Sequence, residues 1–155
     1  MVYKTESDVL LHHRCLSWRI PMCLDSLIET DHTITEGYKV FDTTWRHISF
    51  IMFPGYTLNN TTYNGDCSVK VPQRRWLNSI TTNVGAYKSG FHFYETLEGA
   101  QEYANQVGAP WRIMKIKVKE ILASGYQCLL ESRDSFNKVH VAKQMFILKE
   151  VCSSD

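Results

Sequence analysis

The segment from residue 90 to residue 119 constrains the fold most strongly, because its apolar residues change their period twice. Phe91 and Phe93 alternate with more polar residues, and this alternation predicts a strand with one apolar face. The opposite face of that strand then carries the imidazole of His92 beside the phenol of Tyr94. Such a pair offers hydrogen-bond donors and acceptors to a ligand or a partner, and packing beneath a loop is the simpler alternative.

A helix and a second strand follow within the same segment. Thr96 is a candidate N-cap, and apolar residues then recur at spacings of three and four, which predicts a helix over about residues 96–107. Gly108 and Pro110 suit the end of that helix. Farther on, apolar residues alternate with cations, so we expect a strand with one apolar and one cationic face. The cations are Lys115, Lys117 and Lys119.

The rest of the chain carries weaker signals. Residues 1–36 have helical spacings on both sides of Pro21, which predicts a helical N-terminal extension of two short helices packed on the sheet. Runs rich in aromatic and β-branched residues predict strands at 38–41 and 48–53. The Asn-rich stretch at 59–62 indicates turn chemistry, because asparagine tolerates left-handed backbone. Residues 72–85 are expected to form a long loop or a short helix.

The C-terminal third predicts a last hairpin. Gly125 and Asn137 frame its two arms, at roughly residues 126–130 and 139–148. The second arm loses strict alternation near residues 143–144, which predicts a β-bulge there.

Together these elements predict one domain over residues 1–155. A chain of this length buries enough surface for a core of its own. The expected class is α+β: a twisted, mostly antiparallel sheet with one central helix at about 96–107 and a short helical piece at the N-terminus.

Composition and charge narrow the function. The formal net charge of +1 gives no global field toward nucleic acid or an anionic membrane. The longest apolar runs are four residues, far below a membrane span of about 18. The N-terminal residues lack the pattern of a secretion signal, and five cysteines without a repeated spacing argue against a disulfide framework. We therefore expect a cytoplasmic protein.

Two sets of residues suggest ligands and were weighed against simpler roles. The lysine stripe and the run Arg74-Arg75-Trp76 combine cations with an aromatic ring, as single-stranded nucleic acid sites do. Because acidic residues nearly balance the basic ones, we expect these lysines to keep a strand soluble or to protect a sheet edge, with no nucleic-acid partner. His12, His13, Cys15 and Cys23 lack the paired short spacing of a zinc site, so we expect no metal. Phosphate-loop, dinucleotide-fold, nucleophile-elbow and zinc-protease motifs are absent from the sequence.

Several short motifs together resemble a group of small uncharacterised proteins of bacteriophages and bacteria. They are Gly90-Phe91-His92-Phe93-Tyr94-Glu95-Thr96-Leu97, Tyr103-Ala104, Met114-Lys115-Ile116-Lys117-Val118, Gly125 and Val141-Ala142-Lys143-Gln144-Met145. They cover about the last 70 residues. The resemblance implies a phage or bacterial origin and action in the cytoplasm, and it implies no known reaction.

The same order of elements is distantly similar to the ADP-ribosyltransferase-like fold, including the RNA 2′-phosphotransferases. That resemblance implies an NAD cleft between the strands at 38–41 and 90–94, in which Lys39 holds a phosphate while His92 and Tyr94 orient the ribose or nicotinamide. The chain departs from the family pattern, because its strand at 38–41 has neither the histidine nor the arginine of those enzymes and its last hairpin has no aligned glutamate.

We therefore expect a non-enzymatic binding module of phage type, without a cofactor, which binds and inhibits a host or defence protein. Exposed aromatic residues in the irregular middle of the chain would supply contact area, and packing onto the sheet is an equally good role for them. An enzyme that uses NAD is the alternative. The candidate binding residues are Tyr38, Lys39, Trp76, His92 and Tyr94.

Overall fold

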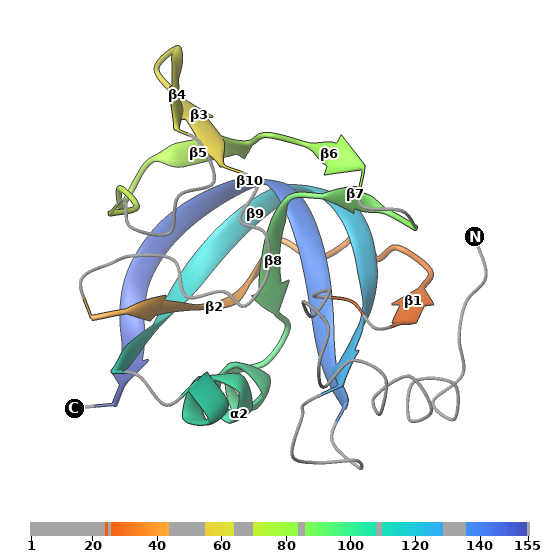
Figure 1. The fold of residues 1–155 in the computed structure, drawn as a ribbon, viewed down its shortest axis with the longest axis vertical. Helices are drawn as coiled ribbons and strands as arrows, with labels where there is room; N and C mark the ends of the chain where they lie inside the picture. The colour runs from red at the N-terminus through yellow and green to blue at the C-terminus, as the bar shows by residue number, and fades with distance from the viewer. Residues whose placement is uncertain are drawn as a thin grey trace.

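A long curved hairpin organises the fold (Figure 1). Its arms, β9 (Trp111–Cys128) and β10 (Phe136–Ser153), pair antiparallel along nearly their whole length. This architecture is taken from a computed structural model. The residues that the structure describes are 24, 26–43, 55–63, 70–83, 86–107, 110–128 and 136–154.

Each arm of the hairpin uses its second edge to bind two further strands. The outer edge of β9 pairs with β2 (Glu36–Asp42) and β1 (Ser26–Ile28). The outer edge of β10 pairs with β8 (Phe91–Tyr94) and β5 (Trp76–Ser79). All of these pairings are antiparallel.

One further pairing closes part of the sheet. Tyr38 of β2 lies opposite Tyr94 of β8, so the strands β9, β2, β8 and β10 form a closed ring. The ring brings β2 and β8 together although each is held mainly by a different arm of the hairpin.

The remaining strands form a small extension. Beyond β5 the sheet continues with β3 (Tyr56–Leu58) and β4 (Thr61–Tyr63). Asn59 and Asn60 join these two strands with φ angles of 49° and 63°, so the turn expected at 59–62 is confirmed for 59–60, while Thr61 and Thr62 belong to β4. A separate pair consists of β6 (Thr82–Asn83) and β7 (Lys88–Ser89).

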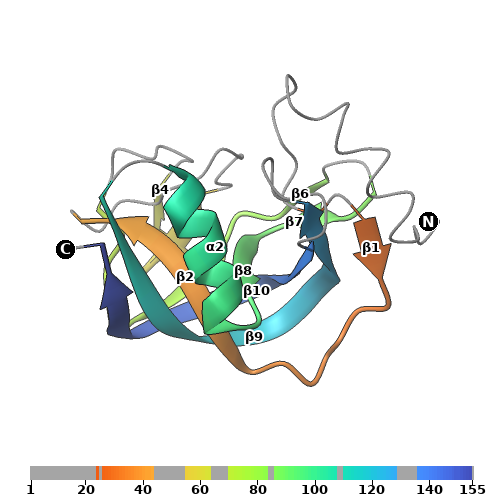
Figure 2. The same cartoon turned by 90° about the horizontal axis from the view of Figure 1, so that it is seen from below.

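The helix α2 (Leu97–Val107) confirms the helix expected at about 96–107. Thr96 is its N-cap, because its Oγ1 accepts the backbone N–H of Gly99 at 3.1 Å. Figure 2 shows α2 lying across β2 and β8, and it contacts these strands and β9. We call the sheet surface that α2 covers the helix face and the opposite surface the far face.

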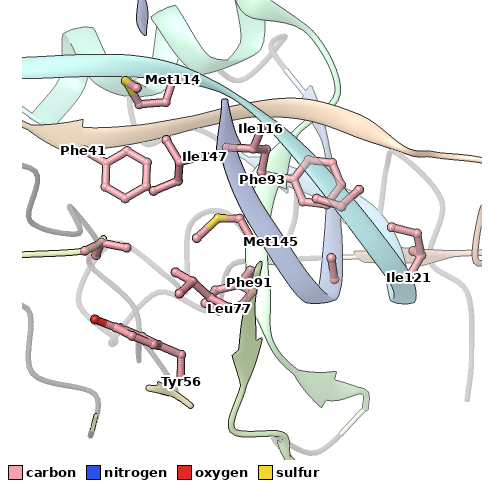
Figure 3. Packing of buried hydrophobic residues seen from close by; sticks show 13 residues of the cluster. Phe41, Tyr56, Leu77, Phe91, Phe93, Met114, Ile116, Ile121, Met145 and Ile147 are labelled. Carbon is pink, nitrogen blue, oxygen red and sulfur yellow. The ribbon is translucent and has the colours of Figure 1, made fainter. Parts of the chain in front are cut away.

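Hydrophobic residues cover both faces of the sheet and form one cluster on each face. Adjacent residues of a strand point to opposite faces, so they belong to different clusters. Val40 joins the helix-face cluster while Phe41 joins the far-face cluster. In the same way Tyr94 packs on the helix face and Phe93 on the far face. Figure 3 shows the far-face cluster, where Phe91 and Phe93 are 0% exposed. The expected apolar face of the strand at 91–94 is therefore confirmed.

The predicted α+β class is wrong. Strands account for 63% of the described residues and helix for 10%. The predicted helical N-terminal extension is wrong in its described part, because Ser26–Ile28 is strand β1. Leu24 and Leu27 have helical spacing, yet both are buried in the helix-face cluster beside a strand that pairs with β9. The predicted helix before Pro21 lies outside the described residues.

The predictions for the other strands and loops are confirmed in part. The strand at 38–41 is confirmed as part of β2, and the strand at 48–53 lies outside the described residues. The loop or helix predicted at 72–85 is wrong, because β5 and β6 fall there. The β-bulge expected near 143–144 is displaced: the register shifts between Val141 and Ala142, and it is unchanged from Ala142 to Gln144.

Gly125 provides a test of the pairing between β1 and β9. A Cβ at this position would lie 2.0 Å from the carbonyl oxygen of Ser26, so the two backbones approach too closely for a side chain. We expect Gly125→Ala to lower the free energy of unfolding by about 1–3 kcal/mol in urea titrations. The exposed Val151 is the control, and Val151→Ala should change stability by about 0.5 kcal/mol or less. Equal stability of Gly125→Ala and the natural chain would contradict the pairing.

Candidate functional site

The structure distributes the five predicted binding residues over two environments. Lys39, His92 and Tyr94 lie around the junction of β2 and β8, where each makes internal contacts. Tyr38 is half-buried at the border of the helix-face cluster. Trp76 lies apart from them on β5.

The contacts of His92 fix the state of its ring. Nδ1 lies 3.1 Å from the carbonyl oxygen of Gly90, which can only accept, so Nδ1 carries the proton. Nε2 of the neutral ring then accepts the hydroxyl of Tyr87 at 3.0 Å. Removal of the ring from water and, to a smaller extent, the nearby Lys39 ammonium together lower the pKa of His92 to about 3. His92 is therefore neutral at physiological pH.

Lys39 links β2 to β8, two strands of the closed ring of strands. The side chain is 4% exposed, and its Nζ donates to the carbonyl oxygen of His92 at 2.5 Å. Because Tyr38 and Tyr94 form the one residue pair in the register between β2 and β8, this bond reinforces a short ladder. A role of Lys39 at a cofactor phosphate stays a prediction.

Tyr94 is also held from within. Its hydroxyl donates to Oε1 of Gln127 on β9, and its ring lies 5.5 Å from the ring of Tyr103 on α2. The phenol is buried, so it joins the helix to the sheet. The donor and acceptor groups of His92 and Tyr94 therefore have partners inside the molecule.

Sequence reasoning missed a polar chain across β8, β9 and β10. The Oγ of Ser124 lies 2.7 Å from Nδ1 of His140 and accepts the backbone N–H of Asp31 at 3.0 Å. On the other side of the ring, Nε2 of His140 is 3.5 Å from Oε1 of Glu95. The one local signal was a histidine inside an apolar run, between Val139 and Val141.

This serine, histidine and glutamate have the composition of a hydrolase triad, but their burial gives them a structural role. Ser124 and His140 are both 0% exposed, so the hydroxyl has no access to a substrate from solvent. Burial also lowers the pKa of His140, while the Glu95 carboxylate opposes that shift. These polar residues therefore connect β9, β10 and Glu95, which directly follows β8, through a hydrogen bond and a contact between His140 and Glu95.

A candidate binding surface that is exposed lies on the helix face, beyond the part that α2 covers. Residues directly opposite each other in a ladder project from the same face, so the registers define rows of side chains. Ile113 of β9 packs in the helix-face cluster, and the lysines at 115, 117 and 119 continue the same face. One row across four strands consists of Glu36, Lys117, Phe146 and Trp76.

Aromatic rings and ammonium groups touch within this row and its neighbour. The rings of Trp76 and Phe146 lie 5.5 Å apart, and both side chains are half-buried. Nζ of Lys119 lies 4.0 Å from the centre of the Trp76 ring, which is a cation–π contact. The next lysine, Lys117, is exposed beside Phe146.

A second row places like charges opposite each other. Lys115 of β9 pairs in register with Lys149 of β10, an arrangement that destabilises a sheet. Lys115 is compensated by Glu36, whose Oε1 lies 3.4 Å from its Nζ, whereas Lys149 is exposed. We define the lysine–aromatic surface as Trp76, Lys115, Lys117, Lys119, Phe146 and Lys149.

The described residues offer neither a metal site nor a membrane-spanning helix. Within the described ranges there is no group of three or more histidine, cysteine or acidic residues that could hold a metal ion. The sequence candidates His12, His13, Cys15 and Cys23 lie outside these ranges. No helix in the described part of the chain has the length and hydropathy of a membrane span.

The neutral state of His92 predicts a pH-dependent stability. The unfolded chain binds a proton below about pH 6.5, while the folded chain does so near pH 3, so stability falls as the pH drops between these values. The expected slope is about 1.4 kcal/mol per pH unit. In urea titrations at about pH 7, 5.5 and 4.5, His92→Gln should lack this contribution.

The control for this experiment is His32→Gln, because His32 is exposed. It should keep the slope of the natural chain. If His92→Gln loses stability with falling pH as steeply as the natural chain does, the assignment of a neutral, internally bonded His92 is wrong.

Comparison with protein-family models, with curated proteins and with solved structures finds no match to the chain. The resemblances to small phage and bacterial proteins and to the ADP-ribosyltransferase-like fold therefore stay predictions. What the chain does has to follow from the geometry of its own residues.

Proposed function

We propose that the protein is a non-enzymatic binding module and that the lysine–aromatic surface is its binding site. The observation that carries this proposal is the row in which Lys117, Phe146 and Trp76 stand side by side on three strands. Exposed cations and half-buried rings on one rigid sheet offer charge and contact area together.

The distribution of polar groups supports binding over catalysis. His92, Tyr94 and His140 carry the chemistry that an enzyme would use, and each has hydrogen bonds or ion-pair contacts inside the molecule. In the lysine–aromatic surface, by contrast, Lys117, Lys119 and Lys149 are exposed, and its members are lysines and aromatic residues without a histidine or a carboxylate. Use of NAD remains the alternative, and no described contact favours it over binding.

The charge of the surface defines the partner. The strand rows of this surface contain four lysines and, among the described strand residues that pair with them, one acidic residue, Glu36, so a partner that carries many negative charges complements it. The overall charge of +1 hides this asymmetry because acidic residues lie elsewhere on the chain. A host or defence protein, as the sequence suggested, would need an acidic patch to bind here.

Retention on immobilised heparin tests the proposal with a defined polyanion. The double variant Lys117→Glu/Lys119→Glu should elute at lower salt, and the slope of log K against log salt should fall by about 2. The matched control is Lys70→Glu/Lys88→Glu, which changes the net charge equally at exposed positions outside the surface. The control should elute close to the natural chain. Equal loss of retention in both double variants would contradict a local binding surface.

A further inference from the structure

We propose that the lysine–aromatic surface binds single-stranded nucleic acid. This inference rests on the binding function proposed above and names the class of partner.

The lysines form a linear array of charge. Alternate residues on a strand are about 6.7 Å apart, so Lys115, Lys117 and Lys119 leave the backbone of β9 at a regular pitch, with flexible side chains that can reach groups along that line. Lys149 of the neighbouring strand broadens this line. A regular line of cations suits a partner whose negative charges also repeat along a line, as the phosphates of a nucleic acid do.

The aromatic residues supply surfaces for stacking, which the lysines alone do not offer. Trp76 and Phe146 are half-buried, their rings contact each other at 5.5 Å between centroids, and they stand next to the lysine line. Bases stack on such rings without regard to sequence, because every base has a π-face. A folded acidic protein would use the lysines and gain less from the rings.

The contact between Lys119 and Trp76 shows how both parts act together. Its ammonium covers the indole face at 4.0 Å in the free protein. When a phosphate is present, the flexible lysine side chain can turn from the ring to the phosphate and release that face for a base. The exchange replaces a cation–π contact with a charged contact and a stacked base.

The opposed pair Lys115 and Lys149 favours the same partner. Two ammonium groups directly across a ladder repel each other, and the ion pair with Glu36 offsets one of them. A phosphate between the two lysines removes the repulsion. A duplex would offer phosphates but keep its bases stacked inside, so the rings favour a single strand.

The experiment is a fluorescence anisotropy titration of a labelled oligo(dT) and a labelled oligo(U) of about 12 nucleotides each, which separates DNA from RNA. The proteins are the natural chain, Trp76→Leu, Phe146→Leu and Lys117→Glu/Lys119→Glu. The matched control is Tyr126→Leu, a half-buried aromatic residue on β9 outside the surface. Circular dichroism melting checks that every variant is folded.

We expect the natural chain to bind at least one of the oligonucleotides, with affinity that falls steeply with salt. Trp76→Leu should weaken binding by roughly 5- to 150-fold, the range for loss of one stacked base. Tyr126→Leu should leave the affinity within about twofold of the natural chain. Quenching of tryptophan fluorescence in the natural chain, absent from Trp76→Leu, would support stacking on this ring.

Three results would overturn the inference. If binding depends on the lysines but not on Trp76 and Phe146, the surface recognises charge alone. If poly-glutamate displaces the protein from immobilised heparin while neither oligonucleotide binds, the partner is an acidic protein. Both outcomes leave the proposed binding function intact. If neither heparin nor an oligonucleotide binds, the proposed function fails together with the inference.

Discussion

The pairing of β9 with β10 is the constraint on which the rest of the structure depends. Both strands use both of their edges, so every strand of the large sheet except the β3–β4 extension is held by one arm of this hairpin. The register of the hairpin therefore decides which side chains meet across strands. The closed ring of β9, β2, β8 and β10 is a consequence, because the curved arms bring β2 and β8 together at Tyr38 and Tyr94.

The same alternation that builds the core also builds the candidate surface. Along β9, the helix face carries Ile113 where α2 covers it and Lys115 two residues farther on. The far face stays apolar through both positions, with Met114 and Ile116 fully or almost fully buried. On the helix face of β9, the residues therefore change from apolar to cationic at the point where α2 no longer covers the strand.

Local signals predicted the local features well. The cap at Thr96, the burial of Phe91 and Phe93 and the cationic face of β9 follow from patterns within a few residues. The N-terminal error has a physical reason as well. A spacing of three between Leu24 and Leu27 fits a helix, and sequence alone cannot show that the edge of β9 is open to Ser26–Ile28.

Features that depend on strand register could not be predicted. Trp76 and Phe146 are far apart in the chain, and only the pairing of β5 with β10 places them beside Lys117. The lysine stripe and the run Arg74-Arg75-Trp76 both stand out in the sequence, but their spacing along the chain does not show that Trp76 lies beside the lysines. The chain from Asp31 through Ser124 and His140 to Glu95 also joins four distant segments.

The most direct measurement of the central claim is a map of backbone amide shifts in ¹⁵N-labelled protein during titration with oligo(dT). The account predicts that the largest changes fall on β5, on β9 at residues 115–119 and on β10 at residues 144–149. It also predicts small changes at His92 and Tyr94, whose groups are bonded inside the molecule. Changes centred on β8 and α2, with none along the lysine–aromatic surface, would contradict it.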